Sequence, residues 1–154
     1  MYKKKPFRIG DPYIVFYQKV VFLIGLLLII FLLAIGYFLQ ENYIFSIALA
    51  ASIGWLIIVY LYSNVFEVEL TGSSFRIRNI FRSFQIDSKK FKEIKRIYFI
   101  SFLMVIVFDD RKFYFLMKSK DLINDFIFYD NEYERALNQK IIEKIKMIEI
   151  IDGE

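Results

Sequence analysis

Two uninterrupted apolar stretches, separated by only three residues, constrain this chain more than any other feature. Residues 20–39 (VVFLIGLLLIIFLLAIGYFL) and residues 43–62 (YIFSIALAASIGWLIIVYLY) contain no charged side chain. About 20 helical residues span the roughly 30 Å hydrocarbon core of a bilayer. Because only Gln40, Glu41 and Asn42 connect the two stretches, the sequence predicts an antiparallel transmembrane hairpin over residues 20–63. A cleaved signal peptide is the alternative, but its apolar region would be shorter and would not lead into a second span.

Basic residues predict the orientation of this hairpin. Five precede the first stretch, none lies in the connection, and the next ones follow the second stretch: Lys3, Lys4, Lys5, Arg8 and Lys19, then Arg76, Arg78, Arg82, Lys89 and Lys90. Cytoplasmic loops carry the excess of Lys and Arg. We therefore expect a multi-pass protein of the inner (cytoplasmic) membrane with both termini cytoplasmic, and residues 1–19 as a basic cytoplasmic segment.

Small residues in both stretches predict where the two helices touch. Small side chains let helix backbones approach closely in lipid, where packing drives association. The candidates for helix–helix packing are Gly25, Gly36, Ala48, Ala51, Ser52 and Gly54. Such residues are also common in membrane helices for no particular reason, so both interpretations stay open.

Beyond residue 64 apolar and polar residues alternate, which is typical of strands with one buried face. Glu67 and Glu69 alternate with apolar neighbours, so we expect both carboxylates on the exposed face. Residues 71–74 (TGSS) predict a hairpin turn. The strands are expected at residues 65–71, 75–80, 83–86, 93–100, 102–108 and 113–117. The apolar stretch 97–108 is too short for a third span and is interpreted as a core strand.

The C-terminal region predicts an amphipathic helix. Asn131 and Glu134 resemble a capping box, and an apolar stripe follows at Leu137, Ile141, Ile145 and Ile148. We expect this stripe to pack on the end of the sheet. Residues 118–130 stay ambiguous, and part of them could form a short helix.

A meander of short strands followed by one helix resembles the pleckstrin-homology-like (PH-like) barrel. The segments that carry the resemblance are DPYIVFYQKVVF (11–22), FEVELTGSSFRIRNI (66–80) and SFQIDSKKFKEIKRIYF (83–99). In particular, the chain is similar to small bacterial membrane proteins that place a two-helix hairpin directly before a PH-like domain, families that are largely uncharacterised. The resemblance implies an α+β membrane protein: an N-terminal transmembrane α-hairpin, then a PH-like antiparallel β-barrel or sheet over residues 64–154, capped by a C-terminal helix.

The composition argues against catalysis. The chain has no cysteine and no histidine, so thiolate chemistry, the commonest general base and the commonest zinc ligand are missing. Asp109 and Asp110 are adjacent in an expected turn, where Asp is favoured for backbone reasons. Asp121, Asp125 and Asp130 lack the spacing of an EF-hand loop. We expect no catalytic residue, no metal site and no cofactor.

The basic residues Arg76, Arg78, Arg82, Lys89 and Lys90 form a candidate patch that faces lipid or a partner. Anionic head groups would attract it, specifically or not, and a merely solvated flank is the third interpretation. Inositol-phosphate-binding PH domains carry a lysine on the preceding strand, where this chain has Glu67, Glu69 and Thr71, which argues against that pocket. No stacking platform for nucleic acid is evident.

Three hypotheses for function follow. The first is a non-enzymatic binding or scaffolding protein that presents its domain at the cytoplasmic face to membrane lipids, a protein partner or a second copy of itself. Exposed strand edges could accept a partner strand. The second is an immunity protein or an accessory subunit of a larger membrane complex. The third, an enzyme, would need a buried carboxylate cluster or an ordered metal.

Overall fold

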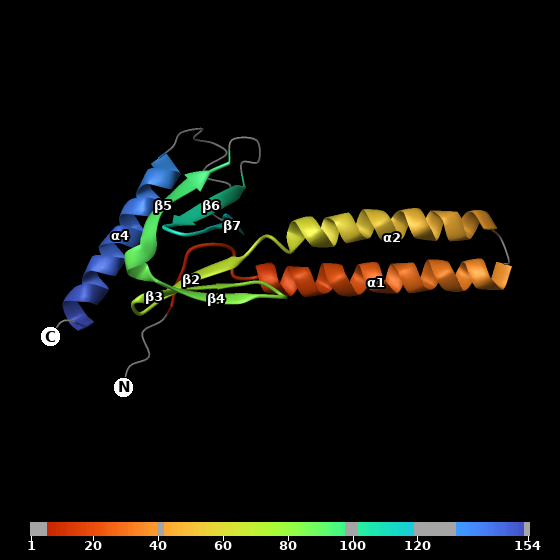
Figure 1. Cartoon of the computed structure of the whole chain (residues 1–154), viewed down its shortest axis with the longest axis horizontal. Helices are drawn as coiled ribbons and strands as arrows, with labels where there is room; N and C mark the ends of the chain where they lie inside the picture. The colour runs from red at the N-terminus through yellow and green to blue at the C-terminus, as the bar shows by residue number, and fades with distance from the viewer. Residues whose placement is uncertain (1–5, 40–41, 98–101, 119–131, 153–154) are drawn as a thin grey trace.

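The computed structural model describes residues 6–39, 42–97, 102–118 and 132–152 of the 154-residue chain. Its two parts lie end to end, a long helical hairpin and a domain of strands closed off by a C-terminal helix (Figure 1). The hairpin consists of α1 (Ile14–Leu39) and α2 (Asn42–Tyr62). Both helices are long and apolar enough to cross a membrane, and only 11% of each apolar window is buried within the molecule.

Helix α1 begins six residues before the uncharged stretch that predicted it. The Asp11 carboxylate accepts a hydrogen bond from the Tyr13 amide at 2.8 Å, and Pro12 precedes the first turn. A side-chain acceptor at a helix start satisfies an amide that has no partner inside the helix. The 26 residues of α1 extend for about 39 Å at 1.5 Å per residue.

Within the described residues, seven strands form two antiparallel sheets. The first sheet has the order β1 (Phe7–Arg8), β2 (Glu67–Thr71), β3 (Ser74–Arg78) and β4 (Ser83–Asp87). The second has the order β5 (Phe91–Arg96), β6 (Leu103–Phe108) and β7 (Lys112–Leu116). A short 3-10 turn, η1 (Ser88–Lys90), leads from one sheet to the other. Gly72, with φ of +56°, makes the tight turn between β2 and β3.

The two sheets do not close into a barrel, which corrects the barrel form of the expected domain. Along one side they are joined by backbone contacts: Val65 forms a parallel bridge with Tyr114, and the Phe66 amide donates to the Tyr114 carbonyl at 2.7 Å. On the other side β5 does not pair with β4. Instead, its backbone bonds to the side chain of Asn138 from helix α4 (Glu132–Asp152).

The core lies between the sheets and α4. Phe75, Ile106 and Phe115 are buried there, and Leu137 and Ile141 of α4 complete it. Ile145 and Ile148 pack against the same cluster, so the predicted apolar stripe of the C-terminal helix is confirmed. Asn131 of the expected capping box and the ambiguous residues 119–130 lie outside the described residues.

The other strand predictions are confirmed to within a few residues, but β1 was not foreseen. Phe7 pairs with Leu70, and Arg8 pairs with Glu69. The N-terminal segment is therefore part of the first sheet. As a result, the strand before α1 and the strand after α2 are neighbours in the same sheet.

Candidate functional site

The most elaborate polar structure in the described residues is the junction between the hairpin and the first sheet. Gln18, in the second turn of α1, is its centre and is only 4% exposed. Its amide nitrogen donates to the Tyr62 carbonyl at 2.7 Å and to the Val65 carbonyl at 2.8 Å. Its amide oxygen accepts from the Ile80 backbone at 3.0 Å. One side chain thus links α1, the end of α2 and the turn between β3 and β4.

Asn79 completes the junction from the sheet side. Its side-chain nitrogen donates to the Ser63 carbonyl, just beyond α2. Its side-chain oxygen accepts from the amides of Phe81 at 2.9 Å and Arg82 at 2.6 Å. Buried polar groups are costly unless they are hydrogen-bonded. The side-chain amides of Gln18 and Asn79 therefore fix the angle between the hairpin and the sheet.

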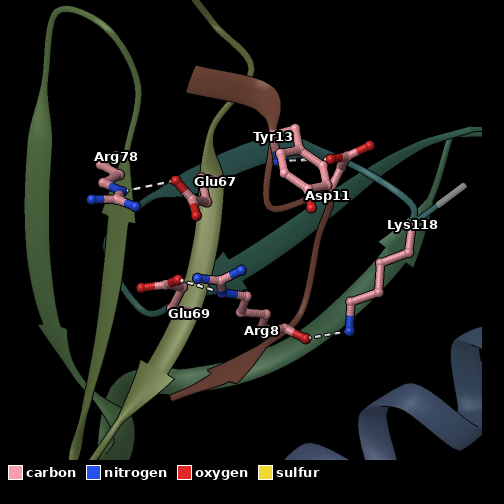
Figure 2. Close-up of polar contacts among 7 residues, drawn as sticks. All are labelled: Arg8, Asp11, Tyr13, Glu67, Glu69, Arg78 and Lys118. Atoms are coloured by element: carbon pink, nitrogen blue, oxygen red, sulfur yellow. Dashed lines mark hydrogen bonds and ion pairs between the residues drawn. The ribbon is translucent and has the colours of Figure 1, made fainter. Parts of the chain in front are cut away.

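Two carboxylates on β2 are buried, contrary to the expected exposed acidic face. Glu67 is 2% exposed and Glu69 is 5% exposed. Arg78 of β3 covers the first, with 2.8 Å between Nε and Oε2, and Arg8 of β1 covers the second at 3.1 Å (Figure 2). The alternation of the strand was right, but arginines from both neighbouring strands shield the polar face.

The ion pair between Glu67 and Arg78 joins paired positions of β2 and β3. The hydrogen bond to Glu67 raises the pKa of the Arg78 guanidinium, which is charged at physiological pH even without this contact. Oε1 of Glu67 has no hydrogen-bond donor among the described residues. Removal of Arg78 would leave a buried, unpaired charge, which is strongly destabilising.

The predicted packing residues of the hairpin occupy different environments. Gly25 lies against Trp55, because a Cβ on Gly25 would come within 1.6 Å of the indole nitrogen. Gly36 lies near Ile44 and Phe45, Ala48 is fully buried, and Ala51 and Ser52 are half-buried. Gly54 has open space, with no atom within 4 Å of the position of a Cβ.

The predicted basic residues lie at different positions along the first sheet and η1. Arg78 is committed to Glu67, and Arg76 is exposed in the middle of β3. Arg82 lies in the turn between β3 and β4, beside the hairpin, whereas Lys89 and Lys90 lie in η1 beyond the other end of β4. A five-residue strand separates the two ends by roughly 16 Å.

In the described segments, the two aspartates of the expected turn between β6 and β7 pair with basic side chains. Asp109 lies 3.2 Å from the Lys92 ammonium and Asp110 lies 3.1 Å from Arg111, all at the surface. No group of three or more metal-ligating side chains occurs there. Asp121, Asp125 and Asp130 lie outside those segments, as does Glu41.

Comparison of the chain with protein-family models, with curated proteins and with solved structures finds no match. The site therefore has to be interpreted from its own geometry.

The junction residues were missed at the sequence level. Asn79 lies inside the strand expected over residues 75–80, although asparagine is common in turns, and Gln18 gives no comparable signal. A single polar residue at the edge of an apolar stretch does not reveal which carbonyls it will meet. The contact of Trp55 with Gly25 could have been suspected, since Trp55 is the only tryptophan of the chain.

Proposed function

We propose that this protein is a membrane-anchored, non-enzymatic binding or scaffolding protein. Helices α1 and α2 cross the bilayer, and the domain of strands is held at its surface. The observation that carries the proposal is the combination of an apolar hairpin, 11% buried in each window, with the Gln18 and Asn79 junction at its base. Exposed apolar surface on this scale requires an apolar partner, and a bilayer provides it along both helices.

The pairing of β1 with β2 supports an even number of crossings. Residues 7–8 precede α1 and residues 67–71 follow α2, yet they are neighbours in one sheet. Both flanks of the hairpin must therefore lie on the same side of a membrane. Because both flanks are basic and the connection is not, we assign that side to the cytoplasm and the protein to the inner membrane.

We further propose that the domain is an open relative of the PH-like fold. The order of its elements supports this, since a meander of antiparallel strands precedes one C-terminal helix that packs into the core. The gap between β4 and β5 distinguishes it from a closed barrel.

That gap also suggests where a protein partner binds. The outer edge of β5 bonds to Asn138 and Glu134 of α4, whereas the outer edge of β4 has no backbone partner among the described residues. An unpaired edge accepts an extended segment of another chain through main-chain hydrogen bonds. Exposed Gln85 lies in the middle of β4, so this edge is the proposed binding surface.

Photo-crosslinking in native membranes tests the proposal. A photoreactive amino acid in place of Gln85 should give a discrete adduct with one protein. The same replacement of Lys144, on the exposed face of α4, should give none. Absence of any adduct at position 85, or equal adducts at both positions, would contradict binding at the β4 edge.

A further inference from the structure

The turn between β3 and β4 carries an exposed aromatic residue at the base of the hairpin. Phe81 is 56% exposed and is followed by exposed Arg82. The turn lies at the end of the sheet nearest the hairpin, beside the first part of α1 (Figure 1). No carboxylate lies within ion-pair distance of Arg82 in the described part of the chain.

This turn is held rigidly, although its side chains are exposed. The three amides of its tip donate to the junction: that of Ile80 to Gln18, and those of Phe81 and Arg82 to Asn79. The fold thus holds the Phe81 ring and the Arg82 guanidinium at one place beside α1. Because the turn is already ordered, binding of a ligand there costs little further loop entropy.

The Phe81 ring continues the apolar surface of the hairpin. Its centroid lies 6.5 Å from that of Phe22 in an edge-on contact, and Phe22 lies 5.4 Å from Trp55 of α2. Ile80 and Phe81, together with Val21 and Val59 of the two helices, line a cavity of only about 10 Å³. That is no more than one water molecule needs.

The sequence places this contact at the boundary of the apolar span. Phe22 is the third residue of the uncharged stretch that begins at Val20, and Lys19 is the last charged residue before it. Aromatic rings and the stems of basic side chains favour the depth of the head groups, where one end of the residue is apolar and the other is hydrated.

We propose that the turn of Ile80, Phe81 and Arg82 contacts the membrane in addition to α1 and α2. The Phe81 ring enters the interfacial layer of the bilayer, and Arg82 reaches the phosphates of the lipid head groups. This inference rests on the proposed membrane-spanning hairpin. The tip, together with the junction, prevents the domain from tilting, and so fixes the orientation of the β4 edge relative to the membrane surface.

Spin labelling of the full chain in vesicles that contain anionic lipid tests this contact. Because the chain has no cysteine, single variants carry one label each: Phe81→Cys at the tip, Leu28→Cys within α1 and Met147→Cys on α4. Leu28 and Met147 are both exposed in the structure, and α4 lies at the end of the molecule away from the hairpin (Figure 1). Power saturation with oxygen and with an aqueous nickel chelate reports the depth of each label.

We expect the label at position 81 to be several-fold less accessible to the nickel chelate than the label at 147, and more accessible than the label at 28. A label at 81 that is as accessible as the one at 147 would overturn the membrane contact and leave the surface to a protein partner. If the label at 28 is also fully accessible to the chelate, the hairpin itself does not span the bilayer, and the proposed function fails instead.

A second labelled variant, Arg82→Cys, retains the Phe81 ring. A label at Arg82→Cys should show low accessibility to the chelate with Phe81 present, and several-fold higher accessibility when Phe81→Ser is added. No change on loss of the ring would mean that Phe81 does not hold the turn in the lipid.

Discussion

The tightest fit in the hairpin is between one glycine and one tryptophan. The Trp55 indole occupies the space where a side chain on Gly25 would be, and its nitrogen is 3.4 Å from the Val21 carbonyl. Helix association in lipid depends on such close packing, because lipid tails are as apolar as the side chains. Only glycine fits beneath this ring without displacing it.

Substitution Gly25→Ala should therefore weaken the hairpin. The new Cβ would overlap the indole, and overpacking of this kind costs about 1–3 kcal/mol. The expected result is a lower midpoint of thermal unfolding in detergent and a shifted Trp55 emission. Gly54→Ala is the matched control, since a Cβ there meets no atom within 4 Å. Equal effects of the two substitutions would refute the contact.

At the scale of the elements, α4 acts as a cover for β5 as well as a core helix. Asn138 accepts from the Ile94 amide at 2.6 Å and donates to the Ile94 carbonyl at 2.9 Å, which imitates a neighbouring strand. Glu134 accepts from the Arg96 amide at 3.0 Å. These side chains take the place that β4 would have in a closed barrel. An exposed strand edge promotes aggregation unless it is covered.

Substitution Asn138→Ala should expose this edge. Loss of the amide leaves both backbone groups of Ile94 without a partner, a cost of about 1–3 kcal/mol. Hydrogen exchange at the Ile94 amide should become faster, whereas exchange in β6 should change only through the lower global stability. Gln139→Ala removes only a surface hydrogen bond to Glu143 and should leave exchange at Ile94 unchanged. Slow exchange at Ile94 without Asn138 would show that the helix does not close this edge.

The elements themselves could be predicted from the sequence because periodicity reports them. The apolar stripe from Leu137 to Ile148 is an example, as is the alternation along Phe75–Ile77. What could not be predicted are contacts between segments far apart in the chain. Arg8 and Glu69 are 61 residues apart, so nothing local indicated that the Glu69 carboxylate would be covered. The two-residue strand β1 is too short to produce a period, and Gln18 finds its partners only once the hairpin is folded.

On the scale of the whole molecule, a hairpin and a domain share one polar junction. Strands of the same sheet precede α1 and follow α2, so both flanks lie on the same side of any membrane that the hairpin crosses. From the basic flanks we propose that the domain lies in the cytoplasm and that the connection of the two helices lies outside.

Cysteine labelling in intact cells tests this central claim most directly. The chain has no native cysteine, so Glu41→Cys, in the connection between the helices, and Ser73→Cys, in the exposed turn between β2 and β3, each report one side of the membrane. A membrane-impermeant maleimide should label residue 41 in intact cells and residue 73 only after the inner membrane is permeabilised. Labelling of residue 73 in intact cells, or of both residues only after permeabilisation, would contradict a hairpin that crosses the membrane and holds the domain on the cytoplasmic side.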